Sequence, residues 1–321
     1  DVKDLVPYQV EMGKDSMGIL RALPRQTTPG GFFYRRSLAR KHLGTDDPVK
    51  IGEMLNSPEK FLETARKLEK VSDGEVKIIA GIPDYQEFSF SSRKEGFINS
   101  KGELVIDSAL IKFLDIADTL RRENLTAELN RLSSKRWYSR MRKDGDVFGY
   151  ALPTWGLPLL KEIAPDAKGD YGLTNGPNPY FWGGTWIGIY KNSKNKELAW
   201  KFVKMMTLDT ETLKWWAKST GDFVGNQAVI NEIKDTFSDP YLKGQNHYKF
   251  FAEEAPKVNA KIICLHEKEI RDSFMVILEE YIEGKCKTKT EAINLFKQKV
   301  KETFPDIITH YPDTTIQYSE K

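Results

Sequence analysis

Cysteine is scarce in this sequence: only Cys264 and Cys286 occur among its 321 residues. The two have neither C-x-x-C spacing nor a nearby pair of histidines, so the pattern predicts no zinc site and no redox motif. Two cysteines do not decide the cellular compartment, and whether they form a disulfide stays open from the sequence.

Long apolar runs and an excess of charge of one sign are also missing. No run approaches the roughly 18 apolar residues that a membrane-spanning helix needs, and no charged-then-apolar leader opens the sequence. The 49 basic and 46 acidic side chains leave a net charge of only +3, which argues against a nucleic-acid partner. We therefore expect either a cytosolic protein or an exported one whose leader has been removed.

Motifs for catalysis and for nucleotide binding are absent as well. L-H-E-K-E-I-R at 265–271 lacks the second histidine of H-E-x-x-H, and G-G-T-W-I-G at 183–188 lacks the lysine and Ser/Thr of a phosphate loop. No G-x-G-x-x-G follows a predicted strand. The sequence therefore predicts no metal, no cofactor and no catalytic residue. None of the four histidines has a partner at the spacing of a metal site or a catalytic triad; they are His42, His247, His266 and His310.

Length and periodicity predict an α/β protein. Domains cluster at roughly 100 to 150 residues, so a chain of this length is expected to form two lobes. Proline and glycine bracket runs that predict strands at 19–24, 30–39 and 76–83. Helices are expected at 57–71, where Ser57 can cap, and at 106–124, 196–206, 211–220 and most of the chain from 240 onward. In the helix at 196–206, one apolar stripe is made by Leu198, Ala199, Phe202, Val203 and Met206.

Aromatic side chains beside glycine and proline are the distinctive feature of the sequence. They occur in loops that each follow a predicted strand, at 25–31, 84–88, 153–156, 179–186 and 220–226. A sugar ring packs its C–H face on an aromatic ring, while its hydroxyls need fixed donors and acceptors such as Gln, Asp and Asn. Glycine lets the backbone approach such a ligand closely. The loops therefore favour a carbohydrate ligand.

Each aromatic candidate also has an alternative role in packing. Trp155, in P-T-W-G, is a platform for a ligand or a contact between lobes, and Trp182 and Tyr85 have the same two alternatives. Trp186 begins a predicted strand and fits a core position equally well. Asp222 either reaches a ligand or orients its own loop. Packing is favoured for Trp200, Trp215 and Trp216, and a structural ion pair for Arg35.

Three segments together resemble a known family. They are L-P-R-Q-T-T-P-G-G-F-F-Y-R-R-S-L at 23–38, G-G-T-W-I-G-I-Y-K-N-S-K-N-K-E-L-A-W-K-F-V-K at 183–204 and T-G-D-F-V-G-N at 220–226. In this order they resemble the extracellular solute-binding proteins of bacterial ABC importers, in the carbohydrate-binding family related to maltodextrin-binding protein. The most specific pattern is S-K-N-K-E-x-A-W-x-F, and the resemblance spans residues 17 to 306.

The resemblance implies a periplasmic-binding-protein-like fold with two discontinuous lobes. Residues 1–26 and 185–219 would form what remains of lobe one, and 27–184 and 220–321 would form lobe two. A sugar or oligosaccharide would bind between the lobes and pass to the membrane permease of an ABC transporter. The protein would work without a cofactor and without catalysis, lipid-anchored at the extracellular face of the cytoplasmic membrane or in the periplasm.

The ligand contacts carried over by the resemblance lie in the same loops. The first crossover between lobes supplies two of them, the D-Y-Q-E loop three, and the P-T-W-G, Y-F-W-G-G and T-G-D-F loops the rest. The expected ligand-binding residues are Gln26, Thr28, Asp84, Tyr85, Gln86, Trp155, Trp182, Gly183 and Asp222.

The sequence departs from the family at its beginning. Family members start with an export signal and a strand-helix-strand run that builds most of lobe one, whereas this sequence opens at D-V-K-D-L-V-P-Y-Q, close to the first crossover. We therefore expect most of lobe one to be missing and its remnant to pair with an N-terminal segment outside this sequence.

Two alternatives stay open: a carbohydrate-active hydrolase with a carboxylate pair drawn from Asp84, Glu87 and Asp222, and an interaction module that has lost its ligand.

Overall fold

The computed structural model describes residues 2–15, 17–129 and 132–310 and contains two compact units. Unit 1 comprises the described residues up to 88 together with 126–260, and unit 2 comprises 89–125 together with those from 261 onward. Helices and strands are mixed throughout unit 1, which confirms the α/β class. The lobe boundaries expected at 26/27, 184/185 and 219/220 stay predictions.

Among the described residues, five strands and ten of the α-helices belong to unit 1. The strands are β1 (Ala22–Gln26), β2 (Gly30–Arg35), β3 (Gly149–Pro153), β4 (Tyr171–Thr174) and β5 (Thr185–Gly188). The helices are α1 (Pro7–Met12), α2 (Arg36–Leu43), α3 (Pro48–Leu55), α4 (Pro58–Val71), α7 (Lys135–Ser139), α8 (Gly156–Ile163), α9 (Lys196–Thr207), α10 (Thr210–Thr220), α11 (Gln227–Ile233) and α12 (His247–Glu254). The short helix α5 (Gln86–Ser91) crosses the boundary, and unit 2 holds α6 (Ser108–Arg122), α13 (Glu267–Ile282) and α14 (Lys289–Thr303).

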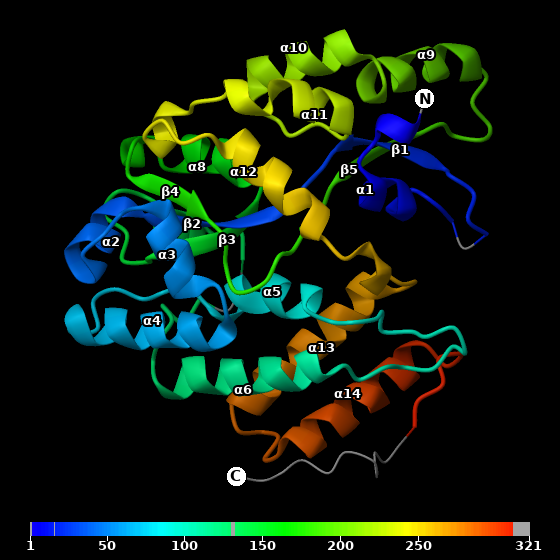
Figure 1. Cartoon of the computed structure of the whole chain (residues 1–321). Helices are drawn as coiled ribbons and strands as arrows, with labels where there is room; N and C mark the ends of the chain where they lie inside the picture. The colour runs from blue at the N-terminus through cyan, green and yellow to red at the C-terminus, as the bar shows by residue number, and fades with distance from the viewer. Residues whose placement is uncertain (1, 16, 130–131, 311–321) are drawn as a thin grey trace. The chain divides into compact units, whose positions relative to one another are not determined.

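A three-stranded antiparallel sheet in the order β3-β2-β4 forms the centre of unit 1. Successive residues of a strand point to opposite faces, and both faces of β2 are buried. The Phe32 ring packs against Phe61 of α4 at 6.1 Å between centroids, and the Phe33 ring packs against Phe251 of α12 at 6.5 Å. Figure 1 shows α4 and α12 on opposite sides of this sheet.

A second, two-stranded sheet pairs β1 with β5 and has a much smaller core. The strands are antiparallel, with Leu23 opposite Ile187, and Leu23 packs with Leu5 and Val203. The apolar stripe predicted in α9 is only partly buried: Val203 is covered, whereas Leu198 and Phe202 are 68% and 52% exposed. One side of α9 packs on β1 and β5, and Leu198 and Phe202 lie largely exposed away from that contact.

The start of helix α4 confirms the prediction from its cap. The Ser57 Oγ accepts a hydrogen bond of 3.2 Å from the Lys60 N–H, which satisfies one of the free donors at the helix start. The strand predicted at 76–83 is wrong in form, although the segment is buried. It makes isolated parallel bridges at Lys77 and Ile79 and then turns into a 3₁₀-helix, η2 (Ile82–Tyr85).

Unit 2 is a helical unit with an aromatic core. The Phe274 ring of α13 packs against Phe113 of α6 at 6.1 Å and against Phe296 of α14 at 5.3 Å. The open question of the disulfide is answered here, because Cys264 and Cys286 are both free thiols. Among the described residues, no helix has the length and the apolar character that crossing a bilayer requires.

Candidate ligand-binding site

Two tryptophans from distant loops meet in unit 1. Trp155 lies between the end of β3 and the start of α8, and Trp182 lies in the loop before β5. Their ring centroids are 4.9 Å apart with planes inclined at 66°, and the Trp155 Nε1 donates a hydrogen bond of 3.2 Å to the Trp182 carbonyl oxygen. Both side chains are half-buried. The pair is therefore a fixed aromatic corner with part of its surface open to solvent.

The double glycine after Trp182 gives this corner its shape. Gly183 has φ +79° and Gly184 has φ +130°, conformations that cost side-chain-bearing residues energy. A Cβ on Gly184 would lie 2.6 Å from the Trp186 ring, whereas a Cβ on Gly183 would find its nearest neighbour, the Trp155 Nε1, at 3.8 Å. The backbone conformation at position 183 therefore favours glycine, although a side chain would have room there. The exposed backbone of Gly183 lies next to the aromatic pair.

Gln26 and Asp222 are joined directly. The Gln26 Nε2 donates to the Asp222 carboxylate, and the Thr185 hydroxyl donates to the Gln26 Oε1 at 3.2 Å. The Asp222 carboxylate also accepts from the Trp216 Nε1 at 3.0 Å and pairs with Arg25 at 3.3 Å. Side chains of β1 and α10 therefore meet at the carboxylate of the loop residue Asp222, which holds them in place.

Arg25 and Trp216 were not among the predicted ligand-binding residues, yet both belong to this cluster. The Arg25 guanidinium lies over the Trp216 ring, 4.4 Å from its centroid. Packing was expected for Trp216, and the signal that could have placed it here is its position six residues before Asp222, near the end of the helix expected at 211–220.

Thr28 connects the polar cluster to the aromatic pair. Its carbonyl oxygen accepts a hydrogen bond of 3.2 Å from the Trp182 N–H, and Gln26 is the partner of Thr185, three residues after Trp182. The predicted residues Gln26, Thr28, Trp155, Trp182, Gly183 and Asp222 therefore lie along one continuous stretch of unit 1. The Thr28 side chain itself is buried.

Asp84 and Tyr85 do not lie on this surface. The Asp84 carboxylate is buried and accepts hydrogen bonds from the Trp137 Nε1 at 2.9 Å and from the Gly81 N–H at 3.0 Å. Burial raises the pKa of Asp84 to about 7, against the effect of these two donors. The Tyr85 ring is 1% exposed and packs against Phe61 at 5.0 Å between centroids.

These two residues are therefore corrected to structural positions. The D-Y-Q-E segment was expected to be an open loop after a strand, but it folds as a 3₁₀-helix whose aromatic side chain enters the core around α4. In this structure neither Asp84 nor Tyr85 has a surface that a ligand could contact. Gln86, the first residue of α5, is half-buried.

The structure does not provide the carboxylate pair that the hydrolase alternative requires. Glycosidic cleavage requires two carboxyl groups that face each other across the substrate. Asp84 and Glu87 are both buried, and the Asp222 carboxylate is occupied by donors from Gln26, Trp216 and Arg25. No group of three or more His, Cys, Asp or Glu side chains within the described ranges could hold a metal ion.

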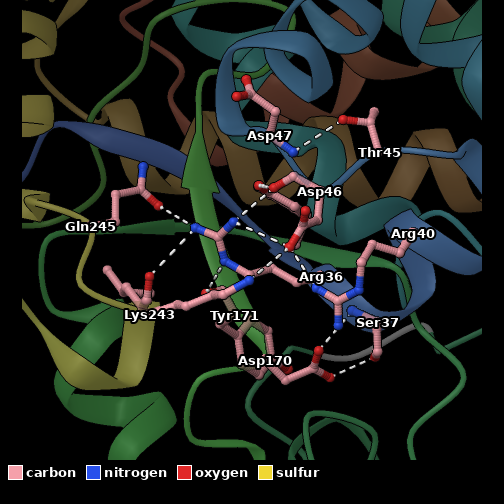
Figure 2. A network of polar contacts seen from close by, with 12 residues as sticks. Arg36, Ser37, Arg40, Thr45, Asp46, Asp47, Asp170, Tyr171, Lys243 and Gln245 are labelled. Carbon is pink, nitrogen blue, oxygen red and sulfur yellow. Dashed lines mark hydrogen bonds and ion pairs between the residues drawn. The ribbon is translucent and has the colours of Figure 1, made fainter.

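Arg35 confirms its predicted structural role. Its Nε donates to the Asp170 carboxylate at 2.8 Å, and its two terminal nitrogens donate to the carbonyl oxygens of Arg142 and Lys143. The neighbouring Arg36 is the centre of a larger polar network between α2, β4 and the segment around Gln245 (Figure 2). These arginines hold the unit together and are distinct from the aromatic corner.

The family is established by comparison with known sequences. The sequence model described as bacterial extracellular solute-binding protein matches residues 2–243, which is most of the chain. This chain therefore belongs to the bacterial extracellular solute-binding proteins. A search of curated proteins gives no match.

Solved structures share the fold at low sequence identity. A protein described as extracellular solute-binding protein family 1 is 18% identical with a TM-score of 0.81, and the match covers 96% of this chain and 78% of that one. The ABC transporter associated binding protein from B. animalis subsp. lactis, in complex with β-1,6-galactobiose, is 19% identical with a TM-score of 0.75, over 94% and 77% of the two chains. The GacH receptor of Streptomyces glaucescens, solved unliganded and with acarbose, is 17% identical with a TM-score of 0.70, over 94% and 75%. These likenesses confirm the solute-binding fold.

Proposed function

We propose that this protein is the substrate-binding component of an ABC importer and that it binds a sugar or oligosaccharide at the Trp155–Trp182 corner. The observation that supports the proposal most directly is the contact between these two half-buried rings beside the exposed backbone of Gly183. A sugar ring would stack on the indoles while its hydroxyls reach polar groups nearby. Similar structures were solved with β-1,6-galactobiose, acarbose, tagatose, lacto-N-biose and maltose.

The site consists of seven of the nine residues expected from the sequence. Its members are Gln26, Thr28, Gln86, Trp155, Trp182, Gly183 and Asp222. Trp155 and Trp182 supply stacking surface, and the Gly183 backbone and Gln26 supply hydrogen bonds to hydroxyls. Asp222 keeps Gln26 and Arg25 oriented.

The protein works by a shift of population between open and closed lobes. A ligand that touches both lobes only in the closed state stabilises closure by its difference in affinity for the two states. The closed form then delivers the sugar to the membrane permease, from the periplasm or from a lipid anchor on the extracellular face. No bond is cleaved, so incubation with an oligosaccharide should release no new reducing ends.

Calorimetric titration tests the proposed site. The titrants are maltose, β-1,6-galactobiose, lacto-N-biose, acarbose and tagatose, and at least one should bind with a Kd near micromolar, about 8 kcal/mol. Trp155→Ala should weaken that binding by about 2 kcal/mol, because it removes a central aromatic anchor. The matched control is Trp200→Ala on α9, which should leave the affinity unchanged. Binding of none of the five sugars would contradict the proposed ligand class, and unaltered binding by Trp155→Ala would remove Trp155 from the site.

A further polypeptide segment completes the lobe that contains residues 1–26 and 185–219. Large apolar side chains are exposed on this part of unit 1, including Met17, Tyr190, Leu198 and Phe202, and patches of this kind mark interfaces. Within the described residues the β1–β5 sheet has only two strands, and such pairs are marginally stable unless more strands or helices cover them. The similar structures are longer, since 75–78% of their chains is matched.

The behaviour of residues 1–321 alone tests this completion. The chain should bind the apolar dye 1-anilinonaphthalene-8-sulfonate and self-associate in light scattering, and Leu198→Lys with Phe202→Glu should reduce both. A monodisperse monomer that binds no dye would contradict the completing segment while leaving sugar binding to be judged by calorimetry.

A further inference from the structure

A small group of buried polar side chains lies next to the aromatic corner. Gln9 of α1 is fully buried, and neither its Oε1 nor its Nε2 has a hydrogen-bond partner among the described residues. The hydroxyls of Thr27 and Thr28 are also buried and equally without a partner in the described part of the chain. A buried polar group left unpaired destabilises the folded state, so a group of them requires an explanation.

Tyr8 belongs to the same group. Its hydroxyl is buried beside the Gln9 side chain and the Thr28 backbone, without a hydrogen bond of good geometry to any described residue. This burial raises the pKa of Tyr8 far above its usual value, so the phenol stays neutral. Its ring lies 5.8 Å from that of Phe181, the neighbour of Trp182.

Several contacts place this group directly behind the double glycine. The Trp186 Nε1 donates a hydrogen bond of 2.9 Å to the Gln9 carbonyl oxygen, and a Cβ on Gly184 would lie 3.3 Å from the Gln9 Nε2. The Trp182 N–H donates to the Thr28 carbonyl oxygen. The unpaired groups therefore adjoin the proposed stacking surface.

The chemistry of the four side chains suits hydroxyl groups. An amide, two aliphatic hydroxyls and a phenol are uncharged, and each of them can donate and accept hydrogen bonds. A sugar hydroxyl has the same two capacities. A charged ligand would instead lose its hydration here with no opposite charge among these four side chains.

We infer that Tyr8, Gln9, Thr27 and Thr28 form a second part of the ligand site, which binds hydroxyl groups of the sugar that stacks on Trp155 and Trp182. The inference rests on the proposed function. The predicted lobe boundary at 26/27 runs between Tyr8 and Gln9 on one side and Thr27 and Thr28 on the other. Opening would expose all four to water, and closing would bring them together onto the ligand.

This arrangement makes closure depend on the ligand. If the lobes close without a sugar, the four groups lose water and gain no well-aligned partners among the described residues, so the empty closed state is disfavoured. If a sugar supplies the partners, the same groups stabilise closure. The unpaired atoms thus increase the difference in affinity between the two states.

The variant Gln9→Leu tests the inference because it keeps the approximate size of the side chain and removes the amide. Without sugar, its melting temperature should rise by a few degrees, since an unpaired buried group has been removed. Its affinity for whichever of the five named sugars binds the wild type should fall at least tenfold. A higher melting temperature together with lower affinity is the expected combination.

Gln245→Leu is the matched control. Gln245 is another glutamine of unit 1, but both its amide atoms are hydrogen-bonded to the Leu173 backbone. This variant should melt at a lower temperature and bind the sugar as the wild type does. If Gln9→Leu does not fold, Thr28→Val, which removes one hydroxyl, replaces it in the same comparison.

Three outcomes would overturn the inference. Unchanged affinity with a higher melting temperature would show that Gln9 is merely a poorly paired core residue. Unchanged affinity with a lower melting temperature would show that its amide has partners of its own, such as ordered water. If the wild type binds none of the five sugars, the proposed function fails, and the second part of the site fails with it.

Discussion

Two polar clusters in unit 1, each centred on a buried side chain, differ in how their hydrogen bonds are met. Around Arg36, every guanidinium nitrogen has a partner: the Nε donates to the Tyr171 carbonyl oxygen at 3.1 Å, the Nη1 to that of Asp46 at 2.7 Å and the Nη2 to the Gln245 Oε1 at 3.2 Å (Figure 2). Around Gln9, the side-chain amide has none among the described residues. The first cluster fixes the scaffold, and the second adjoins the proposed ligand.

The difference separates a cluster that holds the scaffold from one beside the proposed ligand site. Arg36 connects α2, β4 and the segment that carries Gln245, and an unpaired group there would weaken the central sheet. Gln9 and Thr28 connect only the edge of the aromatic corner to α1, where a ligand can supply what the protein does not. Local departures from good pairing are expected at functional sites for this reason.

Removing Arg36 should give the largest effect, because it breaks the satisfied cluster. Arg36→Met removes one donor each from the carbonyl oxygens of Asp46 and Tyr171 and from the Gln245 Oε1, so the free energy of unfolding should fall by about 3–5 kcal/mol. Chemical denaturation measures this change. Arg40→Met is the control: its ion pair with Asp46 is half exposed, so its loss should cost at most about 1 kcal/mol. Equal losses in the two variants would contradict the comparison.

Asp84 extends the comparison to a group that can be charged. It is buried and accepts two hydrogen bonds, yet burial still disfavours its ionised form. Its pKa is about 7 in the folded protein and near 4 when unfolded, so the folded state holds its proton more tightly. Stability from this group is therefore full below about pH 4 and falls as pH rises toward 7, by at most about 1.4 kcal/mol per pH unit.

Unfolding midpoints between pH 4 and pH 8 measure this effect. Asp84→Asn has no titrating group at this position, so its midpoint should vary less with pH than that of the wild type across the interval from 4 to 7. Parallel profiles for the two proteins would show that Asp84 is ionised throughout and that its two donors outweigh burial.

Much of the architecture could be predicted because it depends on local signals. Ser57 before Pro58 predicted the start of α4, and the ordered motifs around 23–38 and 183–204 predicted the solute-binding fold. The residues that form each of these signals are close together in the sequence.

The predictions failed where distant segments decide the outcome. Tyr85 was expected on an open loop, but its ring enters a core formed with Phe61. No local sequence pattern indicates this contact. The stripe of α9 had the spacing of a buried face, yet burial of Leu198 requires a covering element that the described chain does not supply. Gln9 was not predicted at all, because an unpaired buried amide can be recognised only after its surroundings are known.

Two threonines provide the finest test of the comparison, because they are buried beside one another and differ in pairing. The Thr154 hydroxyl donates a hydrogen bond of 3.0 Å to the Thr27 carbonyl oxygen, whereas the Thr27 hydroxyl has no partner in the described structure. Thr154→Val should lower the free energy of unfolding by about 1–2 kcal/mol, since it leaves a carbonyl oxygen unpaired. Thr27→Val should raise it by up to about 1 kcal/mol, because it replaces an unpaired hydroxyl with a methyl group of similar volume. Denaturation curves of the two variants measure the difference. Destabilisation by Thr27→Val would mean that its hydroxyl is already paired. The hydrogen bonds of the Gln9 cluster would then be met as those around Arg36 are.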